Sequence, residues 1–314
     1  MKHYSSVLKI FLPISLILTI LSCAEGPKEE NKSETKFPIE GFWNRKGTVQ
    51  FVNGTPVDTL IYGVDIDPIR QVKAYSRGNI FWMNNVKDEG TAWKGGSGGY
   101  GKFVIAKDTL TEFMSHGSGG MGAAMRYVRD SLNQKSVKFD FAYYLNSEYY
   151  TQLGGGIPNP DENTTYGEFY EKLPSLRKSK MDGIWKRVYE ITFVNGIAVD
   201  TTSVPTGSIL DVKVFKDGYY LVQVDQTRLV DDQSKPEYGG GGSFGQFEYN
   251  NGNLVEYGEF FCGRWDFPEN KPRDKENAHY ASVSFYDDDM YIQITKDTLQ
   301  QGLAGRGVVY RRVQ

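Results

Sequence analysis

Cysteine and histidine are scarce in this sequence, which has two cysteines and three histidines among its 314 residues. A zinc site usually takes three or four ligands at short spacings, and these few residues form no such cluster. Two cysteines also exclude a framework of several disulfides, which small exported domains often use. The sequence therefore predicts no metal site, no cofactor, and a fold that is stabilised by its apolar core.

The usual signatures of catalysis are also missing. Two glycine runs, Gly95–Gly99 and Gly239–Gly242, lead into aromatic segments and not into the Gly-Lys-Ser/Thr and helix of a phosphate-binding loop. Ser115 and His116 are adjacent, but adjacent residues on a strand point to opposite faces, and no nucleophile elbow surrounds them. We therefore expect no catalytic residues and a protein that is not an enzyme, with a hydrolase or isomerase on the same scaffold as an alternative.

The N-terminus has the layout of a secretory signal peptide. Lys2 and Lys9 precede the apolar stretch Ile10–Leu21, which is too short to span a bilayer. The run Leu21-Ser22-Cys23 resembles the lipobox of bacterial lipoproteins, and this resemblance implies that Cys23 is acylated and becomes the mature N-terminus. The alternative is a plain signal peptide with an incidental cysteine. We expect a signal peptide over 1–22 and, over 23–36, the acylated cysteine and a flexible tether without large apolar residues.

The lipoprotein resemblance implies that the protein lies in the bacterial cell envelope, anchored to the outer membrane by its lipid. It does not decide between the periplasmic face and the cell surface. Removing residues 1–22 would remove Lys2 and Lys9 and no acidic residue, so the formal net charge of −3 would become −5. A mildly acidic chain disfavours nucleic acid as a partner, because proteins that bind nucleic acid carry basic patches.

The rest of the chain contains the same pattern twice. Gly41-Phe42-Trp43 recurs 142 residues later as Gly183-Ile184-Trp185, and Phe51–Gly54 recurs at the same offset as Phe193–Gly196. Many matches in the same order indicate a duplication, with small insertions in loops. We expect two similar domains over 37–174 and 180–314.

Each copy is expected to be a β-meander. The 35 glycines and 44 aromatic residues are unfavourable for a helical bundle, and Asn53-Gly54 and Asn195-Gly196 are strong hairpin signals. Short apolar runs, Met125–Arg129 among them, predict eight to ten strands per copy, and no clean 3.6-residue period predicts a major helix. The fold class is therefore all-β, with two tandem antiparallel barrels and glycine runs as loops or bulged strand starts at a barrel rim.

A Gly-x-Trp motif at the start of such a meander, with a basic last strand, resembles the lipocalin (calycin) superfamily, as found in lipoproteins of Bacteroidetes. The resemblance implies that Trp43 and Trp185 anchor the cores, and that Arg312 or its neighbour Arg311 packs across Trp185 to close the second barrel. The first copy offers Glu171 and Lys172 instead of the arginines.

The aromatic residues exceed what two small cores usually need. Barrels of this size can enclose one small ligand behind aromatic walls. The candidate ligand-binding residues are Trp82, Tyr100, Tyr220 and Phe244. We expect a lipid-anchored, non-catalytic protein that binds a small hydrophobic or aromatic ligand, or a glycan, at a barrel mouth. The alternative is a structural or protein-interaction module of the envelope with filled barrels, and the oligomeric state is left open.

Overall fold

The computed structural model describes residues 38–53, 55–61, 69–87, 93–153, 164–204, 210–225, 240–263, 265, 278–295 and 304–314. The predicted signal peptide, Cys23 and the tether lie outside these residues. Residues Lys36–Gln314 form one compact unit. Within the described part of the chain, no helix is long and apolar enough to cross a membrane.

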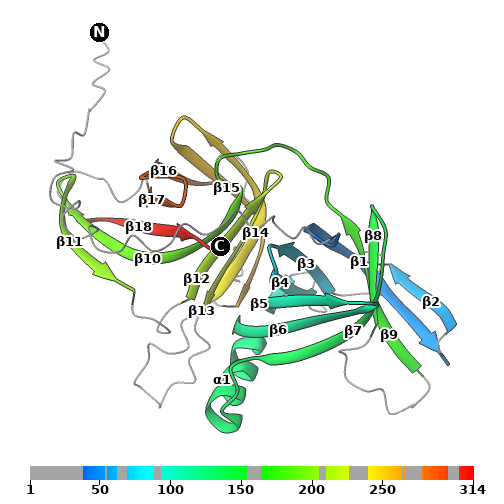
Figure 1. The fold of residues 1–314 in the computed structure, drawn as a ribbon. Coiled ribbons are helices and arrows are strands. Elements are labelled where there is room, and N and C mark those ends of the chain that lie inside the picture. Colours follow the sequence, from blue (N-terminus) through cyan, green and yellow to red (C-terminus); the bar gives the residue numbers. More distant parts are fainter. Residues whose placement is uncertain are drawn as a thin grey trace, which may run out of the picture. The chain divides into compact units, whose positions relative to one another are not determined.

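The first nine strands form one antiparallel sheet that closes on itself (Figure 1). They are β1 (Gly41–Val52), β2 (Thr55–Ile61), β3 (Ile69–Ser76), β4 (Asn79–Lys87), β5 (Trp93–Ala106), β6 (Thr109–Ser118), β7 (Val137–Leu145), β8 (Tyr149–Leu153) and β9 (Thr164–Lys172). Pairing of β1 with both β3 and β9 closes an eight-stranded barrel, and β2 is an extra strand on β1.

The next nine strands repeat this order. They are β10 (Gly183–Val194), β11 (Ile197–Ser203), β12 (Leu210–Lys216), β13 (Tyr219–Asp225), β14 (Gly241–Asn250), β15 (Asn253–Gly263), β16 (His279–Phe285), β17 (Met290–Thr295) and β18 (Ala304–Arg312). Pairing of β10 with β12 and β18 closes the second barrel, and β11 is the extra strand. The predicted all-β fold of two tandem barrels is confirmed.

The irregularities of the sheet recur at equivalent positions in the two barrels. The register shifts at Gln50/Phe51 in the first hairpin and at Thr192/Phe193 in its counterpart. A second bulge lies at Tyr100/Gly101 and at Phe244/Gly245. Because a bulge sets where a strand bends, shared bulges show that the duplication covers the whole barrel.

One sequence prediction is wrong. Met125–Arg129 was expected to be a strand, but it belongs to helix α1 (Gly120–Leu132), which follows β6. Gly119 at φ 60° turns the chain out of the strand, and Met121, Met125 and Val128 then repeat at helical spacing, with Met125 and Val128 buried. Glycine and alanine between these residues obscured the helical period in the sequence.

The glycine runs lie inside strands. Gly95–Gly99 belong to β5, and Gly241 and Gly242 begin β14, whereas Gly239 lies outside the described residues. Gly98 is buried against Gln223 of the other barrel, where a Cβ atom would overlap with the Gln223 amide. These glycines therefore allow close backbone approach and bulging, in place of the flexible rim loops considered from sequence.

Gly245→Ala is expected to destabilise the protein by about 1–3 kcal/mol, because the added methyl group would overlap with the Tyr257 carbonyl oxygen at the bulge. Gly120→Ala in α1 is the matched control, since the one close neighbour of its Cβ would be the Ser97 hydroxyl at 3.1 Å, a side-chain atom and not a backbone oxygen. Urea unfolding of both variants checks this. Equal midpoints would show that the bulge glycine is dispensable.

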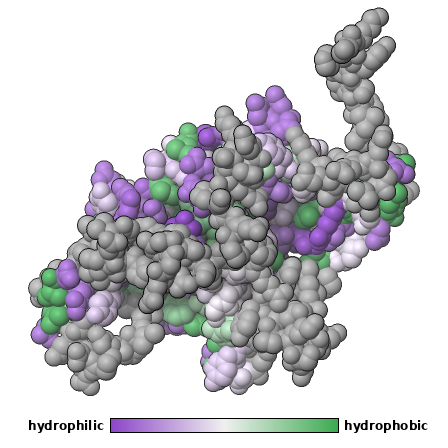
Figure 2. All heavy atoms as spheres, turned by 180° about the vertical axis from the view of Figure 1, so that it is seen from behind, coloured by the Kyte–Doolittle hydropathy of each residue, from purple (hydrophilic) through white to green (hydrophobic). Residues whose placement is uncertain are grey.

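The described surface mixes hydrophobic and hydrophilic residues on the face shown in Figure 2. The extra strands carry several of the exposed hydrophobic residues, including Val57 on β2 and Ile197 and Val199 on β11, which are 55%, 68% and 57% exposed. All seven residues of β11 are exposed. Strand β11 therefore contributes little to the core of the second barrel.

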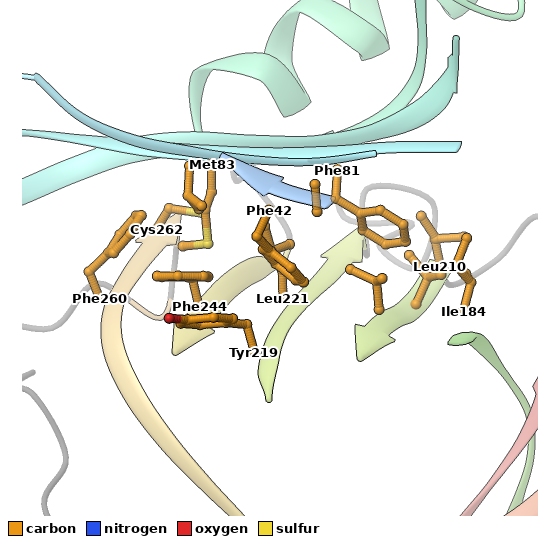
Figure 3. Close-up of a cluster of buried hydrophobic side chains, with 14 residues drawn as sticks. Phe42, Phe81, Met83, Ile184, Leu210, Tyr219, Leu221, Phe244, Phe260 and Cys262 are labelled. Atoms are coloured by element: carbon orange, nitrogen blue, oxygen red, sulfur yellow. The ribbon is translucent and has the colours of Figure 1, made fainter. Parts of the chain in front are cut away.

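The two barrels share a hydrophobic core. Phe42, Phe81 and Met83 of the first barrel face Leu221 and Phe244 of the second (Figure 3). The complete cluster comprises Phe42, Val72, Ala74, Phe81, Met83, Ile184, Leu210, Val212, Val214, Tyr219, Leu221, Phe244, Phe260 and Cys262. Because these apolar side chains are buried between the barrels, the hydrophobic effect favours a fixed contact between the two barrels over a flexible linkage.

Polar contacts surround this shared core. The Gln223 amide donates to the Ser118 hydroxyl at 2.6 Å, and Lys216 pairs with Glu40 at 3.4 Å. The Arg70 guanidinium lies 4.2 Å from the centre of the Phe260 ring. These directional contacts fix the orientation of one barrel against the other.

Candidate functional site

One end of each barrel is filled with aromatic side chains. Trp43 donates to the Ile39 carbonyl at 2.7 Å and meets Tyr150 edge to face at 4.9 Å, and Tyr150 stacks on Tyr170 at 4.5 Å. In the second barrel Trp185 donates to the Met181 carbonyl, also at 2.7 Å, and the same stack is formed by Tyr291 and Tyr310. In both barrels these tryptophan and tyrosine side chains are at most 4% exposed, so this end of each barrel is packed.

A cation lies across each of these tryptophans. The Arg312 guanidinium is 4.1 Å from the Trp185 ring centre, and the Lys172 ammonium is 5.2 Å from the Trp43 ring centre. The side chain across Trp185 is thus that of Arg312, and Lys172 takes the equivalent place in the first barrel. Both cations lie on the last strand, next to the first strand of the same barrel.

A buried polar layer lies directly on this aromatic end. Lys73 pairs with Glu112 at 2.8 Å and donates to the side-chain amide oxygen Oε1 of Gln152 at 2.9 Å. The counterparts in the second barrel are Lys213, Glu256 and Gln293, at 2.8 Å and 3.2 Å. All six residues are at most 6% exposed. We call each set of three residues the polar floor.

Strand alternation explains this layering. Side chains two residues apart share a face, so Tyr75, Lys73 and Gln71 point inward at successive levels of β3. On β9, Tyr170 and Glu168 do the same. Each barrel therefore changes from aromatic to polar within about 7 Å along a strand.

A second carboxylate lies beside each polar floor, but a different strand supplies it. In the first barrel the Tyr170 hydroxyl donates to Glu168 of β9 at 2.6 Å. In the second, Tyr310 donates to Asp211 of β12 at 3.2 Å, and Val308 stands in the register position of Glu168. Both barrels thus keep a carboxylate at this place after the duplication.

Each barrel contains a cavity on the other side of its polar floor. The first cavity has a volume of about 290 Å³ and the second of about 430 Å³. The first is lined by Arg45, Thr48, Ile69, Gln71, Lys73, Trp82, Asn84, Glu112, Met114, Met121, Phe139, Phe141, Gln152, Tyr166, Gly167 and Glu168. The second is lined by Asp211, Lys213, Tyr220, Val222, Ser243, Glu256, Phe261, Trp265, His279, Gln293, Thr295, Val308 and Tyr310. Each barrel therefore has one end that is packed with aromatic side chains and a cavity on the other side of the polar floor.

The four predicted ligand-binding residues separate into two groups. Trp82 lines the first cavity and Tyr220 the second. Phe244 belongs to the core between the barrels, and Tyr100 packs against that core. Burial there raises the pKa of the Tyr100 hydroxyl to about 12, and this hydroxyl donates to Asn79. Tyr100 of β5 and Phe244 of β14 belong to or pack against the core between the barrels and line neither cavity, so Trp82 and Tyr220 stay candidates.

The polar floors were not predicted, although the repeat contained a signal for them. Lys73 and Lys213 are identical at one register position, and so are Glu112 and Glu256. Most charged residues on a barrel wall face solvent, and from sequence these four had no partner. The available signal was that both copies keep charged residues at strand positions whose side chains point into the barrel.

Ser115 and His116 lie closer than strand alternation predicts. The Ser115 hydroxyl is 2.9 Å from His116 Nδ1, because the Tyr100/Gly101 bulge places both residues on one side. Neither residue lines either of the two cavities described above. Among the described residues, no group of three or more His, Cys, Asp or Glu side chains is arranged to hold a metal ion.

The second floor is coupled to a histidine. His279 Nδ1 lies 3.0 Å from the second carboxylate oxygen of Glu256, at the position that Phe139 takes in the first barrel. Burial acts to raise the pKa of Glu256, but Lys213 and His279 outweigh it and lower this pKa to about 2. Burial also raises the pKa of Asp211, against the effect of Lys213 and Arg187.

Acid is expected to destabilise the second barrel through Glu256. Its folded pKa lies below its unfolded pKa, so its stabilisation is present above about pH 4.5 and is lost as the pH falls toward 2. The loss amounts to about 3 kcal/mol. Urea unfolding between pH 6 and pH 2.5 should show Glu256→Gln with a shallower acid slope than the unsubstituted chain. The half-exposed Glu248→Gln is the control and should keep the full slope, and identical slopes for all three proteins would contradict the assignment.

No protein-family model matches this chain, and no curated protein matches it. Among solved structures, a lipocalin-like protein from Bacteroides uniformis is 9% identical, with 44% of this chain and 100% of that one covered and a TM-score of 0.24. An uncharacterised protein from Saccharomyces cerevisiae is 8% identical, covering 87% and 97% of the two chains with a TM-score of 0.38. A transferrin binding protein B from Neisseria meningitidis is 9% identical, covering 88% and 77% with a TM-score of 0.23. Similar structures thus include lipocalin-like proteins, and the fold itself rests on the strand order and register described above.

Proposed function

We propose that the protein binds small, uncharged, hydroxyl-rich molecules such as sugars, one in each barrel, without transforming them. The observation that carries this proposal is the polar floor that both barrels keep beneath a cavity. It narrows the class of ligands expected from sequence, because a wholly apolar ligand would leave these polar groups without partners.

Stability does not account for the polar floors. Removing two charges from water costs several kcal/mol per ion, and replacing a buried pair with apolar residues is often neutral or stabilising. Yet the pairs Lys73–Glu112 and Lys213–Glu256 persist in both copies, each less than 8% exposed by side chain. A binding role gives a reason to keep them.

The charges around each cavity nearly balance. Arg45 and Lys73 in the first cavity match Glu112 and Glu168 in number. In the second, Lys213 pairs with Glu256, and Arg187 lies 3.9 Å from Asp211. Because the charges around each cavity already balance, a charged ligand would stay unpaired in the low dielectric of the barrel interior. An uncharged ligand is therefore favoured.

The walls offer both stacking faces and hydrogen bonds. Trp82 and Phe139 face the first cavity, and Trp265 and Tyr220 face the second, above amide, hydroxyl and carboxylate groups. Sugars present apolar ring faces and many hydroxyls, which such a mixed lining matches. Volumes near the lower end of the usual range of about 300–1,000 Å³ favour ligands of one or two rings.

Isothermal titration and native mass spectrometry test the proposal. The probes are glucose, galactose, mannose, N-acetylglucosamine and maltose, with palmitate and haem as apolar and charged comparisons. We expect saturable binding of at least one sugar. Lys73→Met with Glu112→Gln should abolish binding in the first barrel only, and Lys213→Met with Glu256→Gln in the second only. Each double variant is therefore the control for the other.

Binding of palmitate or haem without any sugar would overturn the uncharged ligand class. No binding of any probe at millimolar concentration would overturn the proposal as a whole. Thermal unfolding of each double variant establishes that a loss of binding is not a loss of the fold.

The envelope location is also part of the proposal. The lipobox-like run ending at Cys23 supports acylation, and the lipid would tether the barrels to the outer membrane. Growth of an expressing bacterium with an alkyne-tagged palmitate should label the protein, and Cys23→Ala should not be labelled. Equal labelling of both would contradict acylation at Cys23.

Protein interaction is a second candidate function. Strand β11 carries Ile197 and Val199 on a fully exposed edge, and exposed edges can pair with strands of other proteins. Crosslinked pull-down from envelope extracts, with Val199→Lys as the control, tests this candidate. A partner that survives Val199→Lys would place the interaction elsewhere.

A further inference from the structure

We infer that the two cavities select ligands by size: the first barrel accepts a single sugar ring, and the second accepts two. This inference rests on the proposed function and concerns the same cavities. It follows from a small set of side chains that differ at equivalent register positions.

The first difference is an exchange between neighbouring strands. In the first barrel Trp82 of β4 lies opposite Gly99 of β5, and in the second Val222 of β13 lies opposite Ser243 of β14. The positions are equivalent, because Trp82 also pairs with Lys73 of the floor and Val222 with Lys213.

Gly99 makes room for the Trp82 indole. A Cβ atom at Gly99 would lie 2.5 Å from the indole nitrogen and 3.1 Å from the Met114 sulfur. In the second barrel Ser243 instead bonds the Tyr220 hydroxyl at 2.9 Å. In the first barrel the large Trp82 and the small Gly99 are therefore complementary in size, and together they direct the indole ring into the cavity.

The second difference lies on the neighbouring strand. Met114 of β6 lines the first cavity opposite the bulge glycine Gly101, and Gly258 takes its place opposite Gly245. Helix α1 adds Met121 to the lining of the first cavity. Trp82 and Met114 thus narrow the first cavity where the second has Val222, whereas the space beside Gly258 is taken by the Phe261 ring, which lines the second cavity.

The volumes agree with this substitution pattern. The first cavity, at about 290 Å³, falls just below the usual range for ligand pockets, and the second, at about 430 Å³, falls within it. The polar floors beneath them are the same, so the chemistry of recognition is shared and the length of the ligand is what differs. We expect the first barrel to reject a disaccharide because Trp82 occupies the space of its second ring.

Titration calorimetry with glucose and maltose tests the inference on the intact chain. We expect two equivalents of the monosaccharide and one of the disaccharide. Trp82→Val should raise the disaccharide stoichiometry to two. Val222→Trp with Ser243→Gly, which copies the first barrel into the second, should lower the disaccharide stoichiometry to zero.

Equal stoichiometry of glucose and maltose on the unsubstituted chain would overturn size selection and leave the proposed function intact. An unchanged stoichiometry in both Trp82→Val and Val222→Trp/Ser243→Gly would overturn the role of these positions. Absence of binding for maltose and for every monosaccharide of the panel would instead overturn the proposed function. Trp82→Leu serves as a second variant if thermal unfolding shows that Trp82→Val is not folded.

Discussion

Lys73→Met is expected to lower the free energy of unfolding by about 3–5 kcal/mol, the cost of leaving a buried charge without its partner. Glu112 would then keep the hydrogen bond from the Tyr75 hydroxyl, at 2.5 Å, but would lose the ammonium that balances its charge. Glu112 is 3% exposed, so water cannot replace the lost ammonium without opening the barrel. Urea unfolding at pH 7 gives the value.

The double variant Lys73→Met/Glu112→Gln separates stability from function. Its free energy of unfolding should return to within about 1–2 kcal/mol of the unsubstituted chain, because the charge pair itself contributes little net stability. If the double variant is as unstable as Lys73→Met, the pair is a stabilising element and the argument for its role in binding fails. The corresponding pair in the second barrel, Lys213 and Glu256, repeats the measurement independently.

Phe81→Ala is expected to cost about 3–5 kcal/mol and to weaken the coupling between the barrels. Phe81 is fully buried and belongs to the core shared by the two barrels, so its loss creates a cavity at the joint. We expect the unsubstituted chain to unfold in one transition and the variant to unfold in two. The 48%-exposed Val104→Ala on neighbouring β5 is the control and should change stability by less than about 0.5 kcal/mol.

Fluorotryptophan signals can follow each barrel separately. Trp43 reports the closed end of the first barrel and Trp185 that of the second. Coincident loss of both signals in Phe81→Ala, at the same denaturant concentration as in the unsubstituted chain, would contradict a stabilising shared core.

The fold followed from the sequence because its signals were local and occurred twice. Asn53 in the first barrel and Asn195-Gly196 in the second lie at the expected turns between the first two strands, with Asn53 and Asn195 both at φ 51°. Each copy supported the interpretation of the other. Helix α1 was missed because it has no counterpart that the sequence could reveal, and its apolar side is made of only three spaced residues.

The candidate site could be predicted only in part from the sequence, because the direction in which a side chain points depends on bulges and on packing between the barrels. Trp82 and Tyr220 point into cavities, but Tyr100 and Phe244, on equally aromatic strands, face the joint. The shared core accounts for part of the aromatic excess that suggested a ligand. Nothing in single strands distinguishes a side chain that faces a cavity from one that faces a second barrel.

The tryptophans themselves allow the most direct test of binding inside the barrels. The chain labelled with 5-fluorotryptophan is titrated with each monosaccharide of the panel and followed by fluorine NMR. Binding above the polar floors should shift the signals of Trp82 and Trp265, which line the cavities, and leave those of Trp43 and Trp185 at the packed ends in place. A titration in which no monosaccharide moves either Trp82 or Trp265 would contradict the account.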